Sequence, residues 1–343
     1  MYPRMTRRST PSGTVRIVEQ FDARAVRAPE LRGDATVERC LAAAITTVRE
    51  LPAPASTSYA LRRFLLDLAD GRTLHVFLKD FDISPHPPEM ALWRGARERY
   101  VYEKILAGRD LGTPALYAVV WDDATDRHWL VLEFVDGRKF QRHPIENLLA
   151  AGRWIGRLHR SVAGDEPRLA QPGILLTYDA TYFQQIAERA VRAVGARFGP
   201  LRPRLDAAVA GYESLIEKIC SARPTLVHGS YRPKNILVAS SSSAVRLCPA
   251  DWELAAIGPA LHDLAFIADG CDRPSIKLLC EAYLETAPSH LTGTRTDDML
   301  EGIERLRLHK ALRSLARSGE WGYPEHTVTA FVAKAEKIRH DLG

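Results

Sequence analysis

The chain has 343 residues, of which 46% are hydrophobic and 26% charged, and its formal net charge is +5. This length suffices for two packed lobes, and the composition is ordinary for a soluble globular protein. The mild positive charge suits anionic ligands such as nucleotides, but without a dense run of Lys and Arg it argues against a nucleic-acid partner.

The first part of the chain is predicted to be rich in strands. Residues 1–35 are expected to form an arm with one short strand at Val15–Val18. An amphipathic helix is expected from Thr36, with apolar residues through Val48 on one face, and Leu51-Pro-Ala-Pro54 is expected to end it. Two hairpins follow, each with an Asp-containing turn. Their strands are expected at 58–69 with 73–81 and at 115–121 with 128–135, with a helix over 89–107 between the hairpins.

From Asp136-Gly137 onward the pattern changes from strands to helices. Apolar residues recur at helical spacing and are interrupted by one hairpin within residues 225–248. The sequence therefore predicts an α+β fold with a small strand-rich N-lobe over residues 36–136 and a larger helical C-lobe over residues 137–343. Helices of the C-lobe are expected at 146–162, 182–198, 205–219, 260–269, 275–286, 297–316 and 326–342.

A lysine at a strand end and a glutamate on the next helix form the first candidate pair. Lys79 follows the alternating run His75–Leu78, and Glu98 falls on the helix after it. Either residue alone is ordinary, since a lysine at a strand end usually faces solvent. Their order within a lobe of two hairpins instead favours a lysine that binds nucleotide phosphates and is held by the glutamate.

The hairpin of the C-lobe carries the second candidate group. Asn235 and Asp251 lie beside apolar strand segments, where an uncompensated aspartate would be costly. Amide and carboxylate oxygens suit Mg²⁺, so we expect these two residues to hold the metal rather than to cap turns. We expect His228 to support the loop by hydrogen bonding rather than to act as an acid or base. We expect Asp263 to hold the same loop rather than to cap a helix.

Together these residues resemble the aminoglycoside phosphotransferase and choline kinase-like family. The resemblance rests on the loop from His228 to Asn235, on Asp251-Trp-Glu253 and on Gly258–Leu264, and it extends over residues 36–290. It implies a bilobal protein-kinase-like fold that binds ATP and Mg²⁺ between its lobes. It also implies transfer of the γ-phosphate to the hydroxyl of a small molecule, such as an antibiotic or a secondary metabolite.

The resemblance also implies a role for individual residues. The hinge would contact adenine through backbone groups, and Ser56, Thr57 and Ser58 would replace the glycine-rich phosphate loop of the family, without glycine's backbone freedom. The implied roles are phosphate binding for Lys79 and Glu98, the hinge for Glu133 and Val135, magnesium binding for Asn235 and Asp251, and the catalytic loop for His228 and Ser230.

Ser230 is the main departure from the family's pattern, which has Asp or sometimes Glu after His-Gly. Serine accepts no proton at neutral pH. A general base contributes about 10²–10⁴-fold to a rate, and phosphoryl transfer depends mostly on positioning and electrostatics, so the loss need not abolish the reaction. Three functions stay open: a small-molecule phosphotransferase, a catalytically silent binding protein, and an enzyme of altered chemistry. The phosphotransferase is favoured because the residues expected to bind phosphate and metal are intact, namely Lys79, Glu98, Asn235 and Asp251.

The acceptor and the oligomeric state are not readable from the sequence. Five aromatic residues of the C-lobe are either walls of an acceptor site or core, and as walls they would suit an aromatic acceptor better than a polycationic aminoglycoside. These aromatic residues are Tyr182, Phe183, Tyr212, Trp321 and Tyr323.

The five cysteines are scattered, which predicts reduced thiols in a cytoplasmic protein. No apolar run is long enough to predict a membrane partner.

Overall fold

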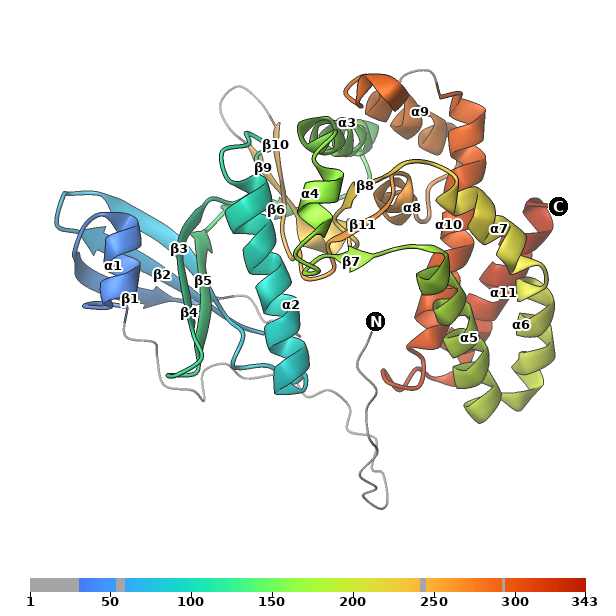
Figure 1. Cartoon of the computed structure of the whole chain (residues 1–343), viewed down its shortest axis with the longest axis horizontal. Coiled ribbons are helices and arrows are strands. Elements are labelled where there is room, and N and C mark those ends of the chain that lie inside the picture. The colour runs from blue at the N-terminus through green and yellow to red at the C-terminus, as the bar shows by residue number, and fades with distance from the viewer. Residues whose placement is uncertain (1–30, 54–58, 241–244, 292–293) are drawn as a thin grey trace, which may run out of the picture.

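The computed structural model describes residues 31–53, 59–240, 245–291 and 294–343 and shows two lobes (Figure 1). The strand expected at Val15–Val18 lies outside these residues. The N-lobe is built on a five-stranded antiparallel sheet in the order β1-β2-β3-β5-β4. Its strands are β1 (Ile45–Leu51), β2 (Ala60–Leu68), β3 (Thr73–Asp80), β4 (Leu116–Asp122) and β5 (Arg127–Glu133).

The prediction of a helix from Thr36 onward is correct only as far as Leu41. Helix α1 (Ala35–Leu41) ends where Ala42 adopts a left-handed conformation with φ of 56°, and the chain continues as β1, which pairs with β2. The run Ile45-Thr-Thr-Val48 explains the difference, because β-branched side chains are restricted in helices and favoured in strands. The sheet therefore has one strand more than the two predicted hairpins.

Helix α2 (Pro88–Tyr100) packs against the end of β3 and carries Glu98. It continues as a π-helical segment, Val101–Leu106, so the predicted helix over 89–107 is confirmed in extent. Gly95 allows a close approach, because a Cβ atom there would lie 2.7 Å from the ring of Phe81. This approach brings Glu98 near the C-terminal end of β3.

The C-lobe is mostly helical, as predicted. The helix expected at 205–219 is divided in two at Ala210-Gly211, since glycine is a poor helix former. The helices are α3 (Ile145–Val162), α4 (Glu166–Ala170), α5 (Ala180–Arg197), α6 (Arg202–Val209), α7 (Tyr212–Cys220), α8 (His262–Ile267), α9 (Arg273–Leu284), α10 (Thr296–Ala316) and α11 (Glu325–Asp341).

Two small sheets accompany these helices, in the orders β10-β9-β6 and β7-β11-β8. The predicted hairpin of the C-lobe is the antiparallel pair β9 and β10. The loop that precedes it, residues 228–235, leads from β8 into β9. The strands are β6 (Arg138–Lys139), β7 (Leu176–Thr177), β8 (Pro224–Val227), β9 (Ile236–Ser240), β10 (Val245–Pro249) and β11 (Ala256–Pro259).

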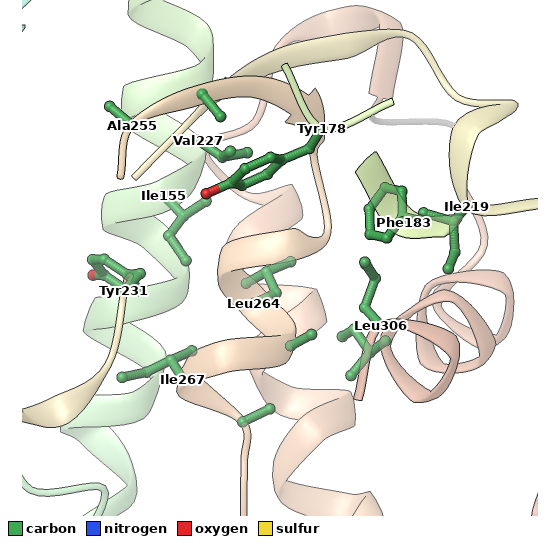
Figure 2. Close-up of a cluster of buried hydrophobic side chains, with 14 of the residues drawn as sticks. Ile155, Tyr178, Phe183, Ile219, Val227, Tyr231, Ala255, Leu264, Ile267 and Leu306 are labelled. Atoms are coloured by element: carbon green, nitrogen blue, oxygen red, sulfur yellow. The ribbon is translucent and has the colours of Figure 1, made fainter. Parts of the chain in front are cut away.

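The hydrophobic core of the C-lobe anchors the first part of this loop. Val227 and Tyr231 are fully buried and belong to the same cluster as Leu264 and Ile267 of α8, as Figure 2 shows. Because its residues before and after Ser230 are fixed in a packed core, the loop holds its polar groups in place.

The aromatic residues of the C-lobe divide between core and surface. Phe183 and Tyr212 are buried in the core and are no part of an exposed wall, whereas Trp321 is 52% exposed. The five cysteines are free thiols, as expected. Among the described residues, none of the helices has both the length and the apolar character needed to cross a membrane.

Candidate active site

The ammonium group of Lys79 lies between two carboxylates at the end of β3. Its Nζ is 2.6 Å from Glu98 Oε2 and 3.2 Å from Asp251 Oδ1. Burial alone would lower the pKa of Lys79, but the carboxylates of Glu98, Asp251 and Glu253 raise it above its ordinary value. Lys79 is therefore charged, and it links the sheet of the N-lobe to the C-lobe through ion pairs. The pair with Glu98 is the one that the sequence predicted.

Asp251 follows β10 in an unusual backbone conformation. Its φ is 70°, in the left-handed region that residues other than glycine seldom adopt. Burial opposes ionisation of this carboxyl, yet the neighbouring Lys79 ammonium lowers its pKa. Such strain persists only where surrounding contacts fix the residue, and it is concentrated at functional sites. The chain thus holds an ionised carboxylate beside the lysine.

Asn235 lies close to Ser230 across the loop. Its Nδ2 donates hydrogen bonds to the backbone oxygen of Ser230 at 3.0 Å and to Ser230 Oγ at 3.1 Å. These bonds orient the amide group, and its oxygen meets no donor among the described residues. Ser230 is 5% exposed, and the carboxylate of the family's pattern is replaced here by a hydroxyl that is already hydrogen-bonded.

The side chains of Asn235 and Asp251 offer an amide oxygen and a carboxylate, which are ligand types that suit Mg²⁺. In the part of the chain that the structure describes, no group of three or more His, Cys, Asp or Glu side chains forms a metal site. Mg²⁺ in phosphotransferases is usually held by one or two protein groups together with phosphate oxygens and water. The available amide oxygen and the ionised carboxylate match such a site better than a metal site built from protein alone.

His228 supports the loop by hydrogen bonding. Its Nδ1 accepts the N–H of Ser230 at 3.3 Å, so Nε2 carries the proton and donates to the carbonyl of Ala250 at 3.0 Å. The ring is fully buried, and burial lowers the pKa of the imidazole. With both nitrogens engaged and the ring neutral, His228 orients Ser230 and the start of the Asp251 segment. This is the role favoured from the sequence over acid–base chemistry.

Asp263 holds the same loop from α8. Its two carboxylate oxygens accept the N–H groups of His228 at 2.6 Å and of Gly229 at 3.1 Å, and the side chain is fully buried. Arg313 of α10 donates to the carbonyl of Gly229 at 3.2 Å. The backbone before Ser230 is therefore fixed by a buried carboxylate and a buried guanidinium.

Gly229 is required by this geometry, and its replacement by alanine tests it. Its φ is +74°, and a Cβ atom would lie 2.0 Å from the carbonyl oxygen of Leu254. Backbone strain alone costs about 1–3 kcal/mol, and in Gly229→Ala the clash adds to it. Urea denaturation should therefore show a loss of unfolding free energy larger than this strain alone would cause. Gly164→Ala is the matched control, because Gly164 has a φ of +90° and no atom within 4 Å of the added Cβ. Equal losses would contradict this account of the loop.

The hinge residues lie at the end of β5. The carboxylate of Glu133 binds Arg246 of β10 at 2.6 and 2.7 Å, and its backbone N–H donates to Ala115. Hydrogen bonds from Arg246 lower the pKa of Glu133, so its carboxylate is ionised and already paired with Arg246. The backbone N–H of Val135 has no hydrogen bond to a described residue. Adenine binding through these backbone groups therefore stays a prediction.

The N-lobe loop contributes a residue that the sequence analysis missed. Ser56, Thr57 and Ser58 lie outside the described residues, but Tyr59 directly after them is buried, and its hydroxyl donates to Glu253 Oε2 at 3.0 Å. The ammonium of Lys79 is 4.8 Å from the centre of the Tyr59 ring. Glu253 was visible in the Asp-Trp-Glu motif, but nothing near it in sequence indicated its partner.

A sequence model of the phosphotransferase enzyme family matches residues 53–290. The match covers more than half of the chain, and the chain belongs to this family. A search of curated proteins finds no match.

Solved structures of phosphotransferases and kinases share the fold. The GDP complex of aminoglycoside 2'-phosphotransferase-IIIa has a TM-score of 0.58 at 10% identity, covering 87% of this chain and 94% of that one. The macrolide 2'-phosphotransferase of Brachybacterium faecium has a TM-score of 0.56 at 15% identity, with 87% and 96% covered. The choline kinase of Cryptosporidium parvum has a TM-score of 0.57 at 13% identity, with 86% and 89% covered. These matches confirm the predicted bilobal protein-kinase-like fold.

Proposed function

We propose that the protein is a phosphotransferase that uses ATP and Mg²⁺ to phosphorylate the hydroxyl of a small molecule. The observation that carries this proposal is the buried Lys79, held between Glu98 on α2 and Asp251 after β10. A buried ammonium fixed by two carboxylates is suited to bind phosphate oxygens. Membership in the phosphotransferase enzyme family supports the same reaction class.

Each part of the site then has a task in phosphoryl transfer. Lys79 binds the phosphates of the nucleotide, and Glu98 keeps the lysine side chain in place. Asn235 and Asp251 hold Mg²⁺, which when bound neutralises charge on the phosphate oxygens. The hinge at Val135 receives the base through its backbone. Solved relatives in complex with GDP and with ADP support a nucleotide as the phosphate donor.

Ser230 positions the acceptor in this proposal but does not keep its proton. Its Oγ, oriented by Asn235, accepts a hydrogen bond from the acceptor hydroxyl, and the proton leaves with solvent or with the transferred phosphoryl group. Positioning and electrostatic stabilisation supply most of the rate in phosphoryl transfer. The reaction is therefore expected to be slow but present.

Nucleotide binding is the first test. Saturating ATP with Mg²⁺ should raise the melting temperature of the wild-type protein, since a ligand at 100 times its Kd stabilises by about 2.7 kcal/mol. GTP is the matched alternative donor, and ATP with EDTA is the control for the metal. The proposal would be contradicted if neither ATP nor GTP, each with Mg²⁺, raised the melting temperature.

The Ser230→Asp variant separates the enzyme from a silent binding protein. At saturating concentrations of a suitable hydroxyl acceptor, a carboxylate at this position is expected to raise the rate of ADP release by about 10²–10⁴-fold, and Asn235 Nδ2 remains available to orient it. Ser230→Ala is the matched control and should show no gain. If the aspartate variant binds nucleotide but gains no turnover across a panel of hydroxylated acceptors, the catalytically silent alternative is favoured.

A further inference from the structure

Three arginines gather beside the catalytic loop, and we call Arg232, Arg313 and Arg317 the arginine cluster. Arg232 is two residues after Ser230, and the guanidinium groups of Arg232 and Arg313 lie 5.5 and 5.3 Å from the centre of the Phe266 ring. Arg313 and Arg317 are four residues apart on α10 and therefore share one face of the helix. The loop and α10 thus direct positive charge toward one region next to Ser230.

The arginine cluster is electrostatically unfavourable as it stands. Like charges four residues apart on a helix repel each other. Burial, followed by the neighbouring Arg313 and Arg317, lowers the pKa of Arg232 to about 10. Burial and the charges of Arg313 and Arg94 also lower the pKa of Arg317, and the carboxylate of Glu320 opposes this shift only in part. Each of these groups would be stabilised by an anion.

Two members of the cluster, Arg232 and Arg317, meet little negative charge among the described residues. The Nε atom of Arg232 is buried without a hydrogen-bond acceptor, and neither Arg232 nor Arg317 forms an ion pair with a described residue. Lys310, which lies 5.1 Å from the centre of the Phe266 ring, differs because Asp269 neutralises it at 2.8 Å. Asp251 is near Arg232 but is engaged by Lys79.

The serine at position 230 belongs to the same arrangement. An aspartate there would add a carboxylate to the loop that carries Arg232 and that Arg313 contacts through Gly229, where it would partly neutralise the cluster and repel an anionic acceptor. Ser230 adds no negative charge beside Arg232 and its neighbours Arg313 and Arg317. The departure from the family's pattern therefore removes a base and, at the same time, a negative charge next to the arginine cluster.

We propose that the arginine cluster binds a carboxylate or phosphate group of the acceptor. The acceptor would then be an anionic hydroxylated small molecule, such as a hydroxy acid or a sugar phosphate, and neither a polycationic aminoglycoside nor an amino alcohol. Guanidinium groups suit this task because their planar N–H donors match the oxygens of carboxylates and phosphates. This inference rests on the proposed function, since it names the substrate class of that site.

Inorganic phosphate and malonate are the probes that test the inference without nucleotide. Both should raise the melting temperature of the wild-type protein at matched ionic strength in NaCl, and kanamycin and choline should not. Arg317→Gln should weaken binding of the probes by about 10–100-fold, the loss expected for one charged hydrogen-bond partner. Arg305→Gln is the matched control, because Arg305 lies on the same helix and pairs with Glu301. No binding of either probe, or equal effects of the two variants, would overturn the inference.

A second experiment tests whether the arginine cluster binds the anionic group of the acceptor or the γ-phosphate of the nucleotide. If the cluster binds the acceptor, phosphate and malonate bind together with ADP and Mg²⁺, and Arg317→Gln leaves ATP affinity unchanged. If Arg317→Gln weakens ATP but not ADP, the cluster contacts the γ-phosphate and the inference is wrong. Ser230→Asp gives an independent check, because its carboxylate should weaken probe binding. Failure of the proposed function would appear separately, as absence of any nucleotide shift.

Discussion

Replacing Lys79 with alanine should abolish the rise in melting temperature that ATP and Mg²⁺ cause in the wild-type protein. The phosphates lose the ammonium that Glu98 and Asp251 hold in place, and any phosphoryl transfer should fall by about 10²–10³-fold, as when a single charge-stabilising donor is removed. The measurement is thermal unfolding with and without nucleotide, followed by the rate of ADP release.

The variant also changes the protein without nucleotide, and the design must separate the two effects. Removing one partner of a buried ion pair costs about 3–5 kcal/mol, because Glu98 is only 1% exposed and is left without its cation. Each variant is therefore compared with itself, with and without ATP. Lys277→Ala, on the exposed surface of α9, is the matched control and should retain the full shift. A nucleotide shift that survives in Lys79→Ala would contradict the assignment of Lys79.

Replacing Asp263 with alanine should destabilise the fold strongly. The N–H groups of His228 and Gly229 would lose their buried acceptor, and each unsatisfied group costs about 1–3 kcal/mol. Urea denaturation should therefore show a loss of about 2–6 kcal/mol, and Ser230 should lose its fixed position. Asp263→Asn should retain part of the stability, since its amide oxygen still accepts one of the two bonds. A loss no larger than that of a typical surface substitution would contradict the supporting role of Asp263.

The contribution of Asp263 also depends on pH. Burial opposes its ionisation, but the hydrogen bonds from His262 and from the backbone of His228 lower its pKa below the ordinary value. A carboxyl group with a lowered pKa stabilises the folded state above its unfolded pKa, near 4, and loses this effect as the pH falls further. The difference in unfolding free energy between wild type and Asp263→Ala should therefore be constant near neutral pH and shrink in acid.

The sequence predicted those parts of the fold and the site that depend on local patterns. The hairpins of the N-lobe, most helices of the C-lobe and the pairing of Lys79 with Glu98 follow from periodicity and from the order of motifs. The helix expected through Val48 failed because pairing with β2 decides the conformation of residues 45–51, and pairing is a tertiary effect.

Other features depend on contacts between distant residues. The hydroxyl of Tyr59 meets Glu253 from 194 positions away in the sequence, so no local pattern could indicate that bond. The arginine cluster likewise joins the catalytic loop to α10, and its members look like ordinary surface arginines when each is read alone. The departure at Ser230 was visible in the sequence, but the positive charge around it was not.

A crystal structure with a non-hydrolysable ATP analogue and Mg²⁺ tests the central claim most directly. The account predicts a nucleotide between the lobes, with its phosphates on Lys79, its base at the backbone of Val135, and the metal on Asn235 and Asp251. A nucleotide bound elsewhere, or absent from crystals grown at saturating analogue, would contradict the claim that this chain retains a working site for phosphoryl transfer.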